Sequence, residues 1–377
     1  MTRHGVRFLG RAAALTVAMT VSYGASAQDI TIGALLPLTG PAAAVGIEEQ
    51  VGVQFAIDKV NAAGGIHSRK VNILYEDSQG KPDVGVLSFN KLVDLREVPA
   101  IMTAFSSVSL AIAPLATRKK ILVINPAAQS NQLENASPYL LNTIPLVKDE
   151  TTVLVKYLVN KLGKKTAGII YENAAAGIDG KEDFKKAFVA AGGRILAEEP
   201  TEFGQTNYRP SLLKVASTKP DLAYIVITQG HPALVEQAGQ VQGFPVGAGT
   251  TFLRPAFGYP PSVGWYQSAI KSGISPEIEK EFMEKKKDFV DSAKVKDMPF
   301  FAREYFNSTN ILLKAIDHVL GKGQPVSGEN LRAAVFEIKS FGSSVGTITF
   351  DKTNTAMRGV EILQYTKDER KVVAVEE

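Results

Sequence analysis

The sequence predicts an α/β protein made of two doubly wound lobes, each a parallel sheet with helices on both faces. Three observations favour this fold class. Short, uniformly apolar strand patterns alternate with helical patterns from residue 29 onward, which is typical of parallel sheets that are buried on both faces. The same alternation restarts after Pro145. The chain also has 377 residues, more than one hydrophobic core usually supports.

The first 27 residues have the pattern of a removable export signal. Arginines at positions 3, 7 and 11 precede a short apolar run at residues 12–21. Small residues follow at 25–27. The alternative is a transmembrane anchor, which needs about 20 apolar residues and is disfavoured by so short a run. We therefore expect a mature protein that begins at residue 28 or 29 and works in the periplasm.

The composition excludes several classes of function. Without residues 1–27, 39 Lys and Arg residues stand against 38 Asp and Glu residues, a net charge of +1, so no basic face for nucleic acid is expected. The chain has no cysteine, which excludes disulfides, thiol catalysis and a lipidated cysteine. No P-loop, no dinucleotide-binding glycine motif and no HExxH occurs. We expect no cofactor and no metal.

The two lobes are predicted from consecutive segments. The first consists of strands at 29–36, 71–75, 100–105 and 121–124 and helices at 47–61, 82–95 and 109–118. The second consists of helices at 149–162, 177–191, 208–217 and 232–242 and strands at 166–171, 195–198 and 222–227. Helices at 276–291 and 300–320 then precede strands at 346–350, 360–365 and 372–375.

One segment of the chain matches a catalytic sequence motif. Residues 342–346 read GSSVG, which fits the GxSxG nucleophile elbow of α/β hydrolases with Ser344 as nucleophile. The elbow needs a strand before the serine and a helix after it, but residues 347–350 have a strand pattern. A turn that leads into a strand is favoured, and an exported hydrolase remains the enzyme alternative.

Two turns in the first lobe are candidates for a ligand site. Ser106 and Ser107 follow one predicted strand, and residues 125–129 follow the next. In open parallel sheets, ligands bind beyond the carboxyl ends of the strands, and hydroxyl and N–H groups at a helix start bind anions. Simple capping of the helix by either serine is an equal alternative on these residues alone.

Several segments resemble the periplasmic branched-chain amino-acid binding proteins and their relatives for amides, urea and aromatic acids. The matching segments are IGALLPLTG at 32–40, IDKVNAAGGI at 57–66, YEDS at 75–78, INPAA at 124–128 and GTITFD at 346–351. The resemblance implies a hinged clamp of two lobes (type I) whose chain crosses three times. Lobe one would hold residues 29–146 and 273–344, and lobe two residues 147–272 and 345–377.

The resemblance also implies where the ligand lies. The ligand carboxylate would contact the two turns. The other ligand contacts would come from positions at which the relatives have bulkier or acidic residues. These positions are Ser106, Ser107, Ala127, Ala128 and Gln129 for the carboxylate, and Val45, Ala176, Gly230, Ala256 and Phe257 for the remainder. Ala256 replaces the acid that holds the ammonium of amino acids, although Glu172 or Asp179 could supply that charge.

These residues favour a carboxylate with an apolar, aromatic or aliphatic body over a free α-amino acid, since a buried ammonium without an acid is costly. Phe252, Phe257 or Tyr259 could stack on it. Branched-chain amino acids or amides are the alternative. The resemblance implies a monomer that delivers its small-molecule ligand to an ABC permease, and a sensor of the same fold is a further alternative.

Overall fold

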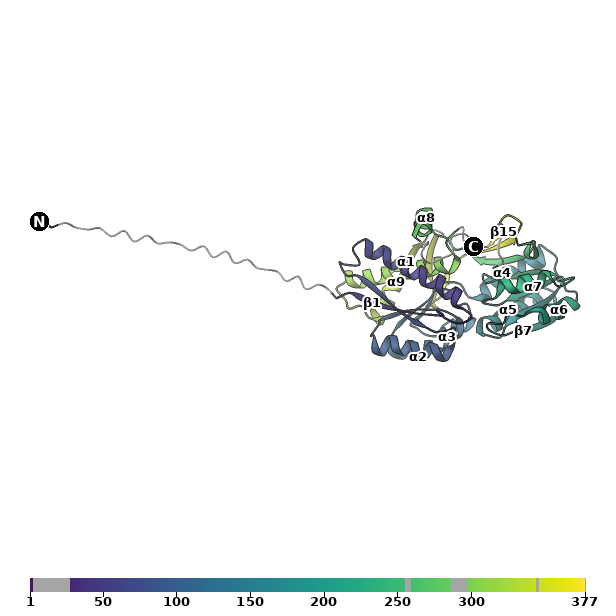
Figure 1. The fold of residues 1–377 in the computed structure, drawn as a ribbon, viewed down its shortest axis with the longest axis horizontal. Coiled ribbons are helices and arrows are strands. Elements are labelled where there is room, and N and C mark those ends of the chain that lie inside the picture. Colours follow the sequence, from purple (N-terminus) through teal and green to yellow (C-terminus); the bar gives the residue numbers. More distant parts are fainter. Residues whose placement is uncertain (3–27, 255–258, 286–296, 344–345, 377) are drawn as a thin grey trace.

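The computed structural model describes residues 1–2, 28–254, 259–285, 297–343 and 346–376. It confirms the predicted α/β class, and Figure 1 shows two lobes side by side, each with helices packed around its strands. The predicted export signal lies almost wholly outside the described residues. Within the described residues, no helix has the length and apolar character needed to cross a bilayer.

The first lobe is built on a five-stranded parallel sheet in the order β2-β1-β3-β4-β5. Its strands are β1 (Ile30–Leu36), β2 (Val71–Asp77), β3 (Ala100–Thr103), β4 (Leu122–Asn125) and β5 (Leu140–Asn142). Its helices are α1 (Ala43–Ala62), α2 (Pro82–Asn90), η1 (Lys91–Leu95), α3 (Ser106–Lys119), η2 (Asn131–Leu133), α8 (Pro276–Lys285), α9 (Phe300–Gly321) and α10 (Gly328–Ile338). Because the strands are parallel, the loops after β1, β3 and β4 meet at one edge.

The second lobe is built on a seven-stranded sheet in the order β15-β14-β10-β9-β8-β6-β7. Its strands are β6 (Thr166–Glu172), β7 (Arg194–Thr201), β8 (Leu222–Val226), β9 (Val246–Gly249), β10 (Tyr266–Ile270), β14 (Val360–Tyr365) and β15 (Arg370–Glu376). Its helices are α4 (Val147–Asn160), α5 (Ala175–Ala190), α6 (Arg209–Ser217), α7 (His231–Gly239) and η3 (Pro260–Ser262). β14 and β15 add an antiparallel edge to an otherwise parallel sheet.

A small third sheet lies where the predicted lobe boundary falls. It contains β11 (Ser340–Ser343), β12 (Gly346–Phe350) and β13 (Ala356–Met357). Ile348 and Ala356 belong to the buried cluster of β1 and α9, and Thr355 bridges Asn142 of β5. The boundary predicted between residues 344 and 345 therefore separates two paired strands, and we propose that the chain returns to the second lobe after Met357. The boundaries predicted after residues 146 and 272 fall just before α4 and after β10.

A buried ion pair joins two of the chain crossings to the first lobe. Arg358, just before β14, contacts Glu304 of α9 at 2.5 Å, and their side chains are 4% and 1% exposed. Arg358 Nη2 also donates to the carbonyl oxygen of Lys271, which follows β10. Breaking such a pair leaves an uncompensated buried charge, so the ion pair holds both crossings against α9.

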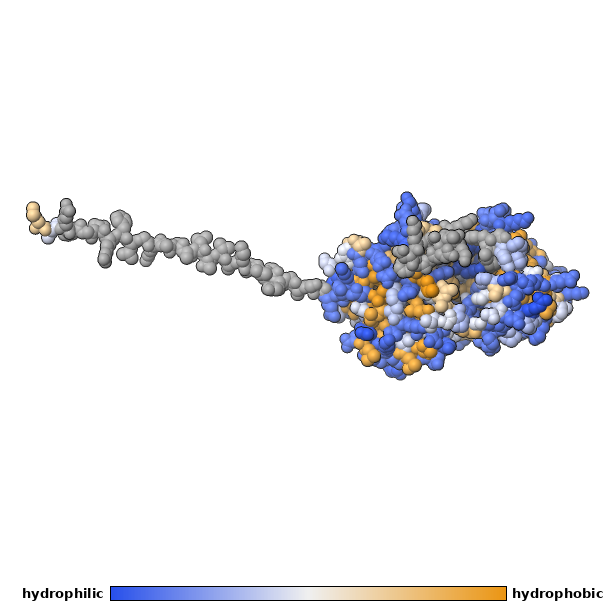
Figure 2. All heavy atoms as spheres, viewed as in Figure 1, coloured by the Kyte–Doolittle hydropathy of each residue, from blue (hydrophilic) through white to orange (hydrophobic). Residues whose placement is uncertain are grey.

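The surface of the two lobes is mainly hydrophilic on the face that Figure 2 shows, with scattered hydrophobic residues. Large exposed apolar side chains include Leu87 of α2 and Leu95 at the end of η1, which are 72% and 73% exposed. Single exposed apolar side chains are ordinary on folded proteins.

The packing of α1 on α9 gives a first prediction. A Cβ added at Gly52 of α1 would lie 2.1 Å from the backbone carbonyl oxygen of Ala302 in α9. Gly52→Ala must push the helices apart, so we expect the free energy of unfolding to fall by about 1–3 kcal/mol, as for other overpacked cores. Denaturant unfolding followed by circular dichroism measures it.

Gly321 at the end of α9 offers the matched control. A Cβ there meets its nearest neighbour, a His67 side-chain atom, at 3.9 Å, so Gly321→Ala should leave stability unchanged or raise it slightly. Equal stability of the Gly52→Ala and Gly321→Ala variants would contradict the close approach of the two helices.

Candidate functional site

A cavity with an empty volume of about 330 Å³, part of which is open to solvent, lies between the two lobes. The first lobe contributes residues from α1, the start of α3, the loop after β4 and α9: Val45, Glu49, Phe105, Ser106, Ala127, Ala128 and Phe301. The second lobe contributes residues from α5 and from the loops after β8 and β9: Ala176, Thr228 and Phe252. A ligand in this space would therefore contact both lobes.

The start of α3 provides hydrogen-bond donors to the cavity. Ser106 is the first residue of α3, and its Oγ accepts a hydrogen bond from the Ser130 N–H at 3.1 Å. The hydroxyl hydrogen of Ser106 is thus left to donate to an acceptor in the cavity. The first N–H groups of a helix lack partners within the helix, and the helix dipole favours negative charge beside them. This part of the cavity suits a carboxylate.

Phe105 precedes α3 in a strained backbone conformation. Its φ is 63° and its ψ is 132°, in the region that residues with a Cβ rarely adopt and that persists where the surrounding structure enforces it. Phe105 is the N-cap residue, and no side chain caps the helix. The alternative in which Ser106 or Ser107 caps α3 is therefore wrong, because the Ser106 hydroxyl is turned toward Ser130.

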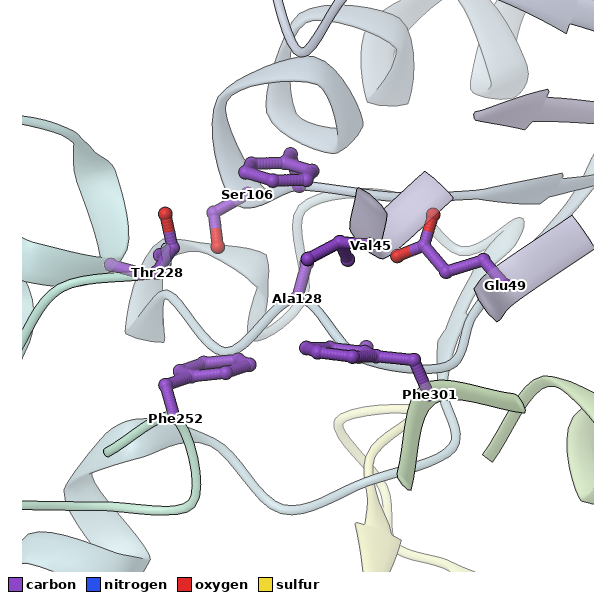
Figure 3. Close-up of a pocket in the computed structure, with 10 residues that line it drawn as sticks. Val45, Glu49, Ser106, Ala128, Thr228, Phe252 and Phe301 are labelled. Atoms are coloured by element: carbon purple, nitrogen blue, oxygen red, sulfur yellow. The ribbon is translucent and has the colours of Figure 1, made fainter. Parts of the chain in front are cut away.

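Aromatic rings from both lobes form the walls of the cavity. Phe252 of the second lobe and Phe301 of the first are stacked, with centroids 6.2 Å apart and an interplanar angle of 15°. Phe105 makes an edge-on contact with Phe203 of the second lobe at 5.6 Å. In Figure 3, Phe252 and Phe301 lie side by side on one side of the cavity and Ser106 lies on the other. Such walls suit a flat apolar body.

An acidic side chain that sequence analysis did not single out also lines the cavity. Glu49 of α1 is 1% exposed, and its Oε2 has no hydrogen-bond partner among the described residues. Burial raises the pKa of Glu49 well above its usual value, a hydrogen bond with Tyr305 acts in the opposite direction, and neighbouring Glu48 adds to the rise. Burial therefore favours the neutral form of the Glu49 carboxyl group.

The structure brings five of the ten predicted positions together. Val45, Ser106, Ala127, Ala128 and Ala176 line the cavity, and that they bind ligand stays a prediction. Of the other described positions, three lie outside the lining set: Ser107, Gln129 and Gly230. Ala256 and Phe257 lie outside the described residues.

Gln129 connects the two lobes behind the cavity. Its Nε2 donates to Glu150 Oε1 at 2.5 Å, and Glu150 Oε2 accepts from the N–H of Thr251 at 2.8 Å. Burial raises the pKa of Glu150 to about 7, against the effect of these hydrogen bonds. Gln129 thus positions the loop that carries Phe252.

Gly230 lies against Tyr208 and leaves no space for a side chain. Its φ is 78°, and an added Cβ would lie 2.1 Å from the hydroxyl oxygen of Tyr208. The space beside Gly230 is therefore filled by Tyr208, and glycine is needed there for both its backbone conformation and its size.

The two acids that could replace the missing ammonium partner are engaged elsewhere. Both oxygens of Glu172 accept hydrogen bonds from the Thr228 hydroxyl, at 2.8 and 3.0 Å, and the Thr228 N–H adds a third at 3.0 Å. Asp179 Oδ2 accepts from the Asn131 N–H at 2.8 Å and from the Ser130 hydroxyl. Neither acid belongs to the described lining of the cavity.

The Asp179 contacts form a latch between the lobes, which we define as Ser130 and Asn131 of the first lobe and Asp179 and Asp183 of the second. Asp183 Oδ2 accepts a hydrogen bond from Asn131 Nδ2 at 2.6 Å. Ser130 also donates its N–H to Ser106 of the cavity. The latch therefore connects closure of the lobes to the residue that provides the anion donor.

The hydrolase alternative depends on residues 342–346. β11 and β12 pair as an antiparallel hairpin in which Ser343 is opposite Gly346, so a strand follows the motif where the nucleophile elbow needs a helix. Ser344 lies outside the described residues. The described neighbours thus do not provide the strand-turn-helix context of a hydrolase.

Comparison with known proteins places the chain in a family. The model of the periplasmic binding protein family matches residues 29–370. The chain therefore belongs to the type I periplasmic binding protein family, as the resemblance implied.

The relatives differ in the ligands for which they are named. The Leu/Ile/Val-binding protein BraC3 of Rhizobium johnstonii is 29% identical over 52% of this chain, and the match spans only 54% of BraC3. The leucine-, isoleucine-, valine-, threonine- and alanine-binding protein of Pseudomonas aeruginosa is 23% identical over 90% of each chain.

The similar solved structures share the fold. A solute-binding protein of an ABC transporter from Rhodopseudomonas palustris, in complex with 3,4-dihydroxybenzoic acid, is similar at a TM-score of 0.80, with 21% identity and coverage of 93% of this chain and 97% of its own. Another from R. palustris, in complex with benzoate, has a TM-score of 0.80 at 20% identity, with coverage of 92% and 96%.

Proposed function

We propose that this protein is the extracytoplasmic solute-binding component of an ABC importer and that it binds a small carboxylate with an apolar, aromatic body between its lobes. The observation that carries the proposal is the interlobe cavity, in which the Ser106 hydroxyl and the start of α3 face two stacked phenylalanines. The donors take the carboxylate, and Phe252 and Phe301 take the ring. Similar folds that hold benzoate and a dihydroxybenzoate support this choice.

The functional step is closure of the two lobes around the ligand. The ligand contacts Ser106 of one lobe and Phe252 of the other, so it binds the closed arrangement more tightly than the open one and shifts the population toward closure. The closed protein then docks on the permease and releases the ligand. No covalent chemistry takes part, and the exported protein acts as a monomer in the periplasm.

Branched-chain amino acids are the second candidate, because curated relatives are named for them. Such a ligand needs an ionised acid beside the carboxylate site, since both of its charged groups are on one carbon. Glu172 is engaged by Thr228 and Asp179 by the latch. The aromatic acid is therefore favoured.

A thermal-shift panel tests the ligand class. At about 100 times its Kd, a ligand that binds only the folded protein adds about 2.7 kcal/mol to the free energy of unfolding. We expect this gain with benzoates, a smaller one with aliphatic acids, and none with leucine, isoleucine, valine or amides. A strong response to leucine together with none to the acids lacking an amine would contradict the proposal and favour the second candidate.

Uptake by cells separates transport from sensing. A strain without this protein should lose uptake of the acid that stabilises it, and expression of the protein should restore uptake. Normal uptake combined with a lost transcriptional response to the acid would mean that the clamp serves a receptor instead.

A further inference from the structure

We propose that a second cavity is a binding site for a small dianion such as phosphate, which it holds between the two lobes beside the chain crossings. We define this hinge cavity by its charged lining residues, which are Arg254 and Arg370 of the second lobe, Arg303 of α9 in the first lobe, and Glu361 of β14. Its described lining shares no residue with that of the ligand cavity. The site is therefore independent of the ligand proposed above.

The first support is an excess of positive charge in a partly enclosed space. The hinge cavity has an empty volume of about 620 Å³, part of which is open to solvent. Three arginines and one glutamate, all only partly exposed, are the charged residues of its described lining. Charges that are partly removed from water are costly unless an opposite charge accompanies them. A dianion would neutralise the excess.

The second support is that two of the arginines lack an ionic partner within the described part of the chain. Arg303 donates to two neutral acceptors, the carbonyl oxygens of Ser272 at 3.1 Å and Met298 at 2.9 Å, and its buried Nε has no acceptor there. Arg254 lies over the ring of Phe300, 4.5 Å from the ring centre. Guanidinium groups are well suited to phosphate and carboxylate oxygens, so an anion is the fitting partner.

The third support is the repulsion among the guanidinium groups. The pKa of Arg254 is lowered to about 10, mainly by burial, and the charges of Arg370 and Arg303 act in the same direction. Glu48 of α1 and Tyr365 of β14 act in the opposite direction. Arg254 thus stays charged at pH 7, and an anion placed among the three guanidinium groups would relieve their repulsion.

The position of the hinge cavity gives the anion a role in closure. Ile270 and Ser272 of its lining flank one of the chain crossings. Arg303 comes from the first lobe, whereas Arg254 and Arg370 come from the second. One anion that contacts all three binds most tightly when the lobes bring them together, so it shifts the population toward that arrangement.

Aromatic rings separate the hinge cavity from the ligand cavity. Phe300 lines the hinge cavity and makes an edge-on contact at 5.4 Å with Phe301, which lines the ligand cavity and stacks on Phe252. We therefore expect phosphate and benzoate to raise each other's affinity by the same factor, about 5-fold or more. This expectation alone rests on the proposed function.

Thermal unfolding and calorimetric titration of the full protein test the site. Phosphate, sulfate and succinate would be compared with chloride at the same ionic strength. We expect saturable binding of phosphate and a higher midpoint of unfolding, and no such response to chloride. Comparison of phosphate with succinate distinguishes an inorganic oxyanion from an organic dicarboxylate as the natural occupant. No saturable response to any of the three dianions would overturn the proposal.

Variants locate the bound phosphate. Arg254→Gln and Arg370→Gln should each weaken phosphate binding by about 10-fold or more. Arg209→Gln removes the same charge from an exposed position on α6 of the second lobe and should stay within about 2-fold of the wild type. Ser106→Ala should also bind phosphate normally. Equal affinities of the three arginine variants would overturn the proposal, and so would a loss in Ser106→Ala, which would place phosphate in the ligand cavity.

Small-angle scattering tests the effect on closure. Saturating phosphate should lower the radius of gyration of the wild type but not of Arg254→Gln, and an unchanged radius in the wild type would refute the role in closure. If benzoate does not bind while phosphate does, the proposed function fails and the hinge cavity stands. If benzoate binds and phosphate does not, the hinge cavity fails and the proposed function stands.

Discussion

Replacing Ser106 with alanine is expected to weaken binding of the carboxylate ligand by about 10- to 150-fold. The variant loses a hydrogen bond to a charged group, which contributes about 1.5–3 kcal/mol. Isothermal titration with the acid identified by thermal shift measures the effect. The loss should appear with every carboxylate tested, because Ser106 contacts the group that all of them share.

Two further variants make the result specific. Ser107 is the next residue along α3 and lies outside the lining of the cavity, so Ser107→Ala should change affinity by less than about 2-fold. Ser106→Thr keeps a hydroxyl that can still accept from Ser130 and should bind better than Ser106→Ala. Unchanged affinity in Ser106→Ala, Ser107→Ala and the double variant would refute the anion site.

Removing the side chain of Asp179 is expected to open the clamp and lower ligand affinity by about 100-fold. Asp179 accepts two hydrogen bonds from the first lobe, from Ser130 and Asn131. One hydrogen bond to a charged group contributes at least about 1.4 kcal/mol, which corresponds to a tenfold change in affinity, so the loss of two bonds corresponds to about 100-fold. These bonds exist only when the lobes are together, so their loss shifts the population toward the open form. Small-angle scattering of Asp179→Ala should show a larger radius of gyration.

The same helix provides graded controls. Asp183 accepts one hydrogen bond across the lobes, so Asp183→Ala should lower affinity by about 10-fold. Glu182 of α5 pairs with Lys181 at 2.7 Å on the same lobe and is 58% exposed, so Glu182→Ala should be nearly neutral. If Asp179→Ala and Glu182→Ala bind and scatter alike, the latch does not contribute to closure.

Most helices and strands could be predicted from the periodicity of apolar residues, and the features that were missed have physical reasons. The long elements follow from apolar spacing, as α9 does at Phe300–Gly321 against a predicted helix at 300–320. β5 and β13 have three and two residues, too few to show a period. The packing of β12 against the buried cluster of β1 and α9 depends on tertiary contacts of Ile348, which no local pattern shows.

From pattern alone, the candidate site could be predicted only where it follows strand ends, whereas Val45 and Ala176 came from the resemblance to the family. Ser106, Ala127 and Ala128 come directly after β3 and β4, where parallel sheets bind ligands. Glu49 lies four residues after Val45, one helical turn away, but an acid in a helix is normally taken as surface. Phe301 reaches the cavity from a distant segment, so only the folded chain reveals it. The close packing of Tyr208 against Gly230 is likewise visible only in the folded chain.

The latch also affects how efficiently the protein would deliver its ligand under the proposed function. Ser130, Asn131, Asp179 and Asp183 are all protein groups, so the stabilisation they give to the closed form does not depend on cargo. Under the proposed function, a fraction of vacant protein would therefore have the same outer shape as loaded protein and would compete with it for the docking face of the permease. A stronger latch would raise affinity and at the same time raise this unproductive occupancy. Uptake at low external concentration is then expected to be fastest at an intermediate latch strength, which the graded series Glu182→Ala, Asp183→Ala and Asp179→Ala samples directly.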